Sequence, residues 1–238
     1  MVDVAYKGDV MSLKTQNCDI EQELEFTASY RWQHWIRAIS IVALTVTGFY
    51  IAIPFIQPAV GAEPTKFLYA LMRSWHLIFG FVLTGVILYK TFMFLFVKDS
   101  SMERKALKDV FNPKIWAQQI GYYLLVSKHP KLSGIYNPLQ FMAYVGFYIM
   151  MIGLILTGLI LYVHVYHDGF AGAIYTVMRS FEVMFGGLAV VREVHHILMW
   201  GVILFVVGHV YMAIYNAVFG KEGAMDAIFS GMKWHKKH

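Results

Sequence analysis

The residues of this chain best suited to chemistry are its ten histidines. Five fall within or beside long apolar segments: His34, His76, His195, His196 and His209. An ionisable side chain inside hydrocarbon is energetically costly, so these five are candidates for function. The other five fall in expected loops or at segment ends: His129, His164, His167, His235 and His238. We expect this second group to be solvated surface side chains.

The spacing of the histidines in the last apolar segment selects one of two neighbours. His195 and His209 are 14 residues apart, which on an α-helix returns to within about 40° of the same face and places the rings about 21 Å apart along the axis. His196 would lie about 140° from His209. We therefore expect His195, and not His196, to share a face with His209.

Helices that cross a membrane must position these rings. Of the 238 residues, 58% are apolar and only 15% are charged, whereas soluble domains carry about 25% charged residues. This composition excludes a soluble enzyme. A membrane-spanning helix needs about 20 mostly apolar residues, and four segments satisfy this: 35–56, 74–97, 139–163 and 194–218. The expected fold is an all-α integral membrane four-helix bundle.

Basic residues indicate how the bundle is oriented. Lysine and arginine concentrate in both tails and in the 98–138 connection, so the positive-inside rule places these parts in the cytoplasm. We expect a cytoplasmic tail over 1–30, a bundle over 31–220 and a basic cytoplasmic tail over 221–238. Topology thus explains the net charge of +5, and no nucleic-acid partner is needed.

Two connections are expected to form surface helices. Residues 103–126 alternate charged and apolar side chains, and 171–185 form a second such stretch that ends at Gly186-Gly187. Amphipathic helices of this kind lie on a membrane surface or dock another subunit.

The expected topology brings the histidines to two depths. His76 begins the second span and is level with His195 near the outer side, while His34 begins the first span and is closer in depth to His209 near the cytoplasmic side. Neutral imidazole is a common ligand of iron, and bundle cores commonly hold haem. The matched pairs predict two haem groups, with His76 and His195 as ligands of one iron and His34 and His209 as ligands of the other.

Three arginines follow the same pattern. Arg31, Arg73 and Arg192 each precede a candidate ligand by three residues, about one helical turn. Each could pair with a haem propionate, or could be an anchor at the end of a span. Thr-Gly pairs recur inside three spans, at 47–48, 84–85 and 157–158, where they favour either close helix contacts or room for a flat cofactor.

The cysteine content excludes other redox chemistry. Cys18 is the single cysteine, and one thiol cannot hold an iron–sulfur cluster or form the attachment motif of c-type haem.

Three stretches resemble the b-type cytochrome subunit of membrane-bound nickel–iron hydrogenases: R-W-Q-H-W at 31–35, R-S-W-H at 73–76 and V-H-H-I-L-M-W-G-V-I-L-F-V-V-G-H-V-Y-M-A at 194–213. The chain is similar, more distantly, to the cytochrome b subunit of formate dehydrogenase. The hydrogenase resemblance implies two haem b groups held by His34, His76, His195 and His209. It also implies a location in a bacterial inner membrane and partners there: the small iron–sulfur and large nickel–iron subunits of a periplasmic hydrogenase, in a complex that can be homo-oligomeric. This chain lacks the cysteines that would hold nickel and iron, so it has no hydrogen-cleaving site of its own.

The same resemblance implies that the chain passes electrons to a quinone, expected to be menaquinone. Asn137, at the inner end of the third span, resembles an asparagine that lines the quinone site in the formate dehydrogenase relatives. A helix-starting turn explains Asn137 equally well.

Two other function classes stay open on the sequence. A free-standing cytochrome b561 that exchanges electrons with quinol would show the same four-helix, two-haem plan. A transporter could use the histidines as a proton relay, but it would need acidic partners within the spans, and the four segments contain no interior Asp or Glu.

Overall fold

The computed structural model describes residues 3–7, 10–14, 20–56, 67–124, 126–127, 130–134, 136–215, 217–218 and 224–236. Three residues discussed above lie outside these ranges: Cys18, His129 and His238.

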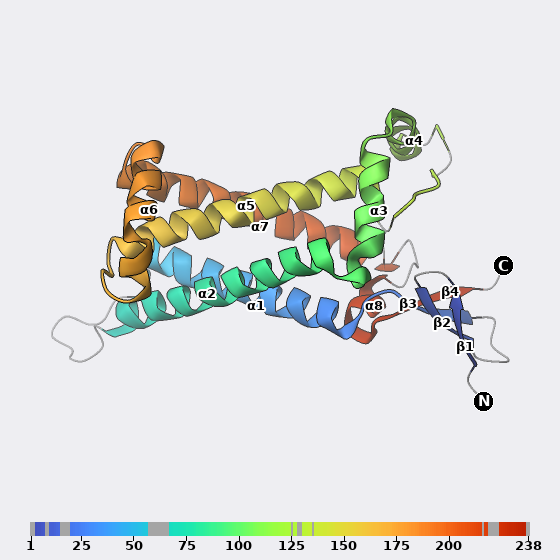
Figure 1. The fold of residues 1–238 in the computed structure, drawn as a ribbon, viewed down its shortest axis with the longest axis horizontal. Helices are drawn as coiled ribbons and strands as arrows, with labels where there is room; N and C mark the ends of the chain where they lie inside the picture. Colours follow the sequence, from blue (N-terminus) through green and yellow to red (C-terminus); the bar gives the residue numbers. More distant parts are fainter. Residues whose placement is uncertain are drawn as a thin grey trace.

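Four long helices form the bundle: α1 (Ala28–Ala52), α2 (Phe67–Phe96), α5 (Pro138–Val163) and α7 (Leu188–Tyr215). All four are long and apolar enough to cross a membrane, which confirms the predicted fold class. Figure 1 shows α1 beside α2 and α5 beside α7. Both α1 and α2 begin seven residues before the expected apolar segment, because the polar turns that carry Arg31 and Arg73 are also helical.

The four spans share one buried core. Its members come from each long helix in turn: Ile41, Leu83, Ile87, Phe147, Met151 and Val202. Close approach of α5 and α7 relies on glycines, since a Cβ on Gly153 would meet Leu198 and one on Gly201 would meet Met150. Large apolar side chains such as Phe96 and Leu204 remain exposed around the outside of the bundle, as expected of a surface that lipid covers.

The connection between α2 and α5 contains two helices, where the sequence analysis expected one over 103–126. A short 3-10 turn, η1 (Lys98–Ser100), leads into α3 (Ser101–Val110), and α4 (Pro113–Tyr123) follows. The break falls at Asn112 and Pro113. The Asn112 side chain accepts a hydrogen bond from the backbone of Lys114, and proline favours the first helical position while preventing a continuous helix through it.

The connection between α5 and α7 contains α6 (Phe170–Phe185), as predicted for 171–185. Gly186 ends this helix at φ 91°, a conformation that glycine adopts easily. Buried side chains of α6 pack on α5 and α7 in a second apolar cluster. We call this the α6 end of the bundle; Figure 1 shows it opposite both chain termini.

A small polar cluster also holds α6 against α5. The Glu182 carboxylate accepts hydrogen bonds from Arg179 at 2.6 Å and from His164 at 2.5 Å. His164, at the carboxyl end of α5, is half-buried. The expectation of a solvated His164 was therefore wrong, because α6 folds an acidic side chain back onto it.

The segments next to the two termini pair in one antiparallel sheet. Strands β1 (Asp3–Lys7), β2 (Val10–Lys14) and β3 (Ile20–Leu24) are followed in the sheet by β4 (Met232–Lys236), which comes directly after α8 (Ala224–Ser230). Glu23 of β3 lies opposite Lys233 of β4. The tails expected at 1–30 and 221–238 thus form one unit. We call this the termini end of the bundle, and it also holds α3 and α4 (Figure 1).

The Glu182 cluster predicts a pH-dependent attachment of α6. Burial alone would raise the pKa of Glu182, but the hydrogen bonds from His164 and Arg179 outweigh it and hold the pKa below its ordinary value of 4.5. A lowered pKa stabilises the folded chain fully above pH 4.5, and this stabilisation disappears as the pH falls through the lowered value. We expect Glu182→Gln to lower the thermal unfolding midpoint at pH 7 and to lose this acid sensitivity. Exposed Glu193 provides the control variant Glu193→Gln; an equal effect of both variants would contradict the prediction.

Candidate functional site

At the α6 end, a hydroxyl of α1 fixes the ring of His76 on α2. Thr47 Oγ1 lies 2.7 Å from the Ala43 carbonyl, to which it donates its only proton, and 2.9 Å from His76 Nδ1. With the hydroxyl proton on the Ala43 carbonyl, Thr47 Oγ1 accepts from His76 Nδ1–H, and the tautomer that fits this bond leaves the Nε2 lone pair available. A Cβ on Gly48 would lie 3.3 Å from His76 Cε1. The Thr-Gly pair thus provides both the hydrogen bond and the space for this ring.

The same arrangement occurs between α5 and α7. Thr157 Oγ1 donates to the Gly153 carbonyl at 2.7 Å and lies 2.8 Å from His195 Nδ1, so the hydroxyl can accept from the Nδ1–H tautomer of the imidazole. Gly158 lies beside the ring, with a Cβ position 3.7 Å from His195 Cε1. Each helix pair therefore presents one imidazole whose free nitrogen is Nε2, the form in which histidine binds a metal while its other nitrogen is held by the protein.

The neighbouring His196 has a different environment. Its side chain is exposed, whereas His195 is half-buried against α5. On the same helix, the His209 ring contacts Tyr144 of α5. His195 and His209 therefore face α5 together, as the helical spacing predicted, and His196 faces away.

At the termini end, the rings of His34 on α1 and His209 on α7 face each other. Their centroids are 6.3 Å apart and the rings are tilted by 48°. Two imidazoles that bind one metal ion from opposite sides, through bonds of about 2 Å, have centroids about 6 Å apart. The observed separation therefore fits a shared metal ion. His34 Nδ1 is buried and has no hydrogen-bond partner within the described residues.

Flat aromatic groups surround this pair. Phe205 stacks on the His209 ring at 6.0 Å with an 8° angle, and Trp35 meets His34 edge-on at 5.4 Å. Tyr144 completes the group, with its ring 6.3 Å from that of His209. The termini-end pair thus lies among large planar side chains, an environment suited to a flat cofactor.

The three predicted propionate-binding arginines have different surroundings. Arg31 donates through one terminal nitrogen to the carbonyl of Phe229 near the end of α8, so it ties α8 to α1. Arg73 is half-buried and Arg192 is exposed, each one turn before its histidine at the α6 end. The propionate role stays a prediction for all three, and Arg31 has an alternative structural role.

Asn137 has a structural role at the start of α5. Its side chain accepts the backbone N–H of Gln140, and the Gln140 side chain accepts the backbone N–H of Asn137. This is a capping box, with Pro138 in the first helical position. The helix-start explanation accounts for the asparagine here, and a contact with quinone stays a prediction.

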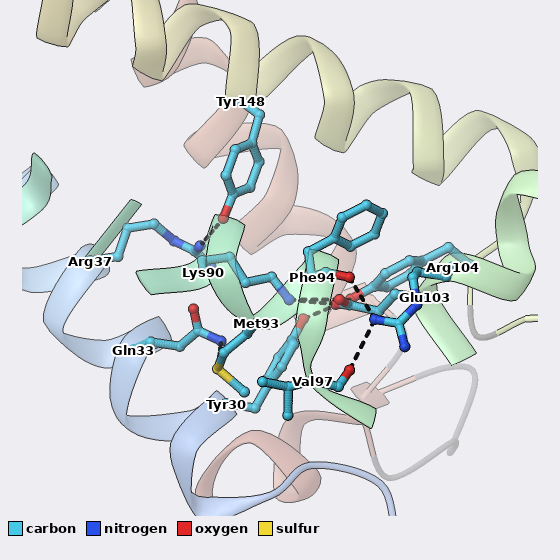
Figure 2. A network of polar contacts seen from close by, with 11 residues as sticks. Tyr30, Gln33, Arg37, Lys90, Met93, Phe94, Val97, Glu103, Arg104 and Tyr148 are labelled. Atoms are coloured by element: carbon cyan, nitrogen blue, oxygen red, sulfur yellow. Dashed lines mark hydrogen bonds and ion pairs between the residues drawn. The ribbon is translucent and has the colours of Figure 1, made fainter. Parts of the chain in front are cut away.

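A buried polar network that the sequence patterns did not predict lies beside the termini-end histidines. Figure 2 shows Lys90 of α2 directed at Glu103 of α3, and Arg37 of α1 directed at Tyr148 of α5. Tyr136, just before α5, also reaches Glu103. Burial, followed by the effects of Tyr30 and Glu103, raises the pKa of Tyr136 well above its ordinary value, so this phenol stays neutral. A lysine inside an apolar span was the available sequence signal.

Known proteins match this chain along the whole bundle. A family model described as prokaryotic cytochrome b561 matches residues 25–231. The probable Ni/Fe-hydrogenase 1 B-type cytochrome subunit of Escherichia coli K12 is 30% identical over 217 residues, covering 89% of this chain and 90% of the relative. The probable Ni/Fe-hydrogenase B-type cytochrome subunits of Cupriavidus necator and Azotobacter vinelandii are 28% and 27% identical, covering 89% of this chain and 86% and 88% of the relatives.

The hydroxyl–imidazole bonds should contribute to the stability of the bundle, and valine variants of the two threonines test this. Thr47→Val or Thr157→Val keeps the side-chain shape but leaves a buried Nδ1–H without its acceptor, which costs about 1–3 kcal/mol. Thr84→Val is the control, because the Thr84 hydroxyl donates to the Gly80 carbonyl of its own helix. We expect thermal unfolding in detergent to show a lower midpoint for the first two variants than for the control. Equal midpoints would show that the two bonds contribute no stability.

Proposed function

The chain belongs to the prokaryotic cytochrome b561 family, and we propose that it is the di-haem membrane subunit of a nickel–iron hydrogenase. In this role it anchors a periplasmic hydrogenase and carries electrons from the iron–sulfur subunit to menaquinone. The hydrogenase link is supported by the names of its relatives, which are B-type cytochrome subunits of Ni/Fe hydrogenases.

The observation that carries the proposal is the arrangement of four imidazoles in two groups at opposite ends of one bundle. The two at the α6 end are held by Thr47 and Thr157 with Nε2 available. The two at the termini end are separated by the distance that a shared metal ion requires. We assign His76 and His195 to one haem b, and His34 and His209 to the other.

The protein residues have separate tasks in this proposal. A haem held between two histidines would supply one-electron transfer at each end of the bundle. Thr47 and Thr157 hold their histidines in the ligating tautomer and set the ring orientation. Apolar side chains of the shared core, among them Met151 and Val202, exclude water from the space between the two ends.

The proposed direction of electron transfer follows from the distribution of basic residues. The basic connection that contains α3 and α4 lies at the termini end together with both tails, which supports a cytoplasmic position for that end. Hydrogen oxidation releases two protons and two electrons outside, and quinone reduction takes up two electrons and two protons near the cytoplasm. Each charge that crosses the membrane corresponds to about 2.3 kcal/mol per 100 mV.

The ligand assignment predicts haem content. A pyridine haemochrome assay should give two haem b per chain in the wild type and one in each of His34→Ala, His76→Ala, His195→Ala and His209→Ala. His196→Ala is the control and should keep both, because His196 faces away from α5. A wild type with less than one haem b per chain would exclude the cytochrome function, and a loss in His196→Ala would overturn the choice of His195.

The hydrogenase link predicts a direct response to hydrogen. In membranes that contain the active hydrogenase, hydrogen should produce the reduced haem b spectrum, and deletion of this subunit should abolish it. If the haems stay oxidised while the hydrogenase is active, a free-standing cytochrome b561 is favoured instead. If formate rather than hydrogen reduces them, the partner is a formate dehydrogenase-like complex.

A further inference from the structure

A buried ion pair lies at the termini end of the bundle. Lys90 Nζ lies 2.8 and 2.6 Å from the two carboxylate oxygens of Glu103, and the two residues are only 7% and 5% exposed. Nearby, Arg104 donates to the carbonyls of Phe94 and Val97 at the end of α2 (Figure 2). The arginine already fastens α3 to α2 through backbone acceptors.

The ion pair continues into a row of hydroxyl groups. Tyr136 donates to Glu103 Oε1 at 3.3 Å, and the hydroxyl oxygens of Tyr136 and Tyr30 are 2.7 Å apart. Because the single proton of Tyr136 is donated to Glu103, Tyr30 must donate to Tyr136. The Lys90 ammonium also lies 4.5 Å from the centre of the Tyr30 ring. These contacts give a continuous row from Tyr30 through Tyr136 to the carboxylate of Glu103.

This row of hydroxyls ends beside the termini-end histidines. Tyr30 precedes His34 by four residues on α1, so the two side chains lie on the same face one turn apart. The Tyr136 ring packs against Tyr144 at 4.9 Å, and Tyr144 in turn contacts His209. The polar row thus runs from α3, on the outside of the bundle, to α1, which carries His34, and ring contacts through Tyr144 of α5 continue from it to His209.

Attachment of α3 does not require these charges. Apolar residues of similar volume hold buried helices together as well as or better than an ion pair, because they avoid the desolvation of two charges. A lysine inside a membrane span, paired with a buried carboxylate of α3, is therefore expected to have a further use. The proposed reduction of a quinone at the termini end consumes protons, and the transfer of these protons is such a use.

We propose that Glu103, Tyr136 and Tyr30 form a proton relay that supplies the quinone reduced near His34 and His209. This inference rests on the proposed function. When Glu103 is protonated, the row reverses: its proton passes to Tyr136, the Tyr136 proton passes to Tyr30, and the Tyr30 proton passes to a quinone oxygen. Three O–H bonds break and three form.

The relay must complete two cycles for each quinone. Glu103 is left ionised beside Lys90 after each transfer and takes a new proton from water on the α3 side. Two electrons from hydrogen oxidation complete the quinol.

Other ionisable groups border the relay. Arg37 of α1 bonds Tyr148 of α5 at 3.2 Å, and Tyr144 of α5 packs on Tyr136. Lys90 is the cation in direct contact with Glu103. Arg37 and Tyr148 are close to the row but make no link in it, which supplies a matched control.

The experiment uses the complete membrane complex with its hydrogenase partners. Tyr136→Phe interrupts the row but leaves the ion pair intact, and Glu103→Gln removes the acid while keeping its shape. Tyr148→Phe removes a hydroxyl from the same region outside the row. For each variant, hydrogen-driven haem reduction, quinol formation between pH 5 and 9, and the solvent deuterium isotope effect are measured.

The relay predicts that hydrogen reduces the haems normally in all three variants. Quinol formation should fall at least tenfold in Tyr136→Phe and Glu103→Gln, with an altered pH profile and isotope effect, and should stay unchanged in Tyr148→Phe. Redox-induced infrared difference spectra should contain a protonated carboxyl band that Glu103→Gln lacks.

Two results would contradict the relay alone: wild-type quinol formation with an unchanged pH profile in Tyr136→Phe and Glu103→Gln, or an equal loss in Tyr148→Phe. A wild-type complex whose haems hydrogen cannot reduce would instead overturn the proposed function, and the relay with it. Haem reduction and quinol formation are measured separately, so the two failures are distinguishable.

Discussion

The hydrogen bond from an imidazole on one helix to a threonine hydroxyl on the next is the interaction on which the arrangement at the α6 end depends. A bilayer offers no water to a buried N–H group, so each ring must find its acceptor within the protein. Thr47 and Thr157 provide it only when their helices are in one rotational register with α2 and α7. The same contacts that position His76 and His195 therefore also fix how the helix pairs face each other.

The imidazole rings at the two ends of the bundle are held by different contacts. At the α6 end each ring bonds a hydroxyl on a neighbouring span. At the termini end His34 and His209 lie against each other and against aromatic rings, close to a lysine, a glutamate and several phenols. Threonine hydroxyls thus fix the rings at the α6 end, whereas the rings at the termini end lie close to the ion pair and phenols of the proposed proton relay.

Helical periodicity and apolar length were enough to predict the four spans and the inward face of α7, because both depend on local spacing alone. Two of the failures involve partners on another helix, and one involves a local signal. His164 was assigned to solvent, yet Glu182 of another helix bonds it. The break at Asn112-Pro113 had a local signal that the charge pattern concealed. Lys90 finds Glu103 only after the chain leaves the bundle and returns along α3, so no spacing rule could reveal the ion pair.

The pairing of β3 with β4 can form only late in synthesis, after the last span has been made. Strand β3 leaves the ribosome before the first span, and its partner follows the fourth. The edge of β3 that pairs with β4 therefore stays unpaired until all four spans have been inserted. Completion of the sheet requires both ends to be on the same side of the membrane, so a chain that inserts with one span missing cannot close it. The closed sheet is therefore compatible only with an even number of membrane crossings.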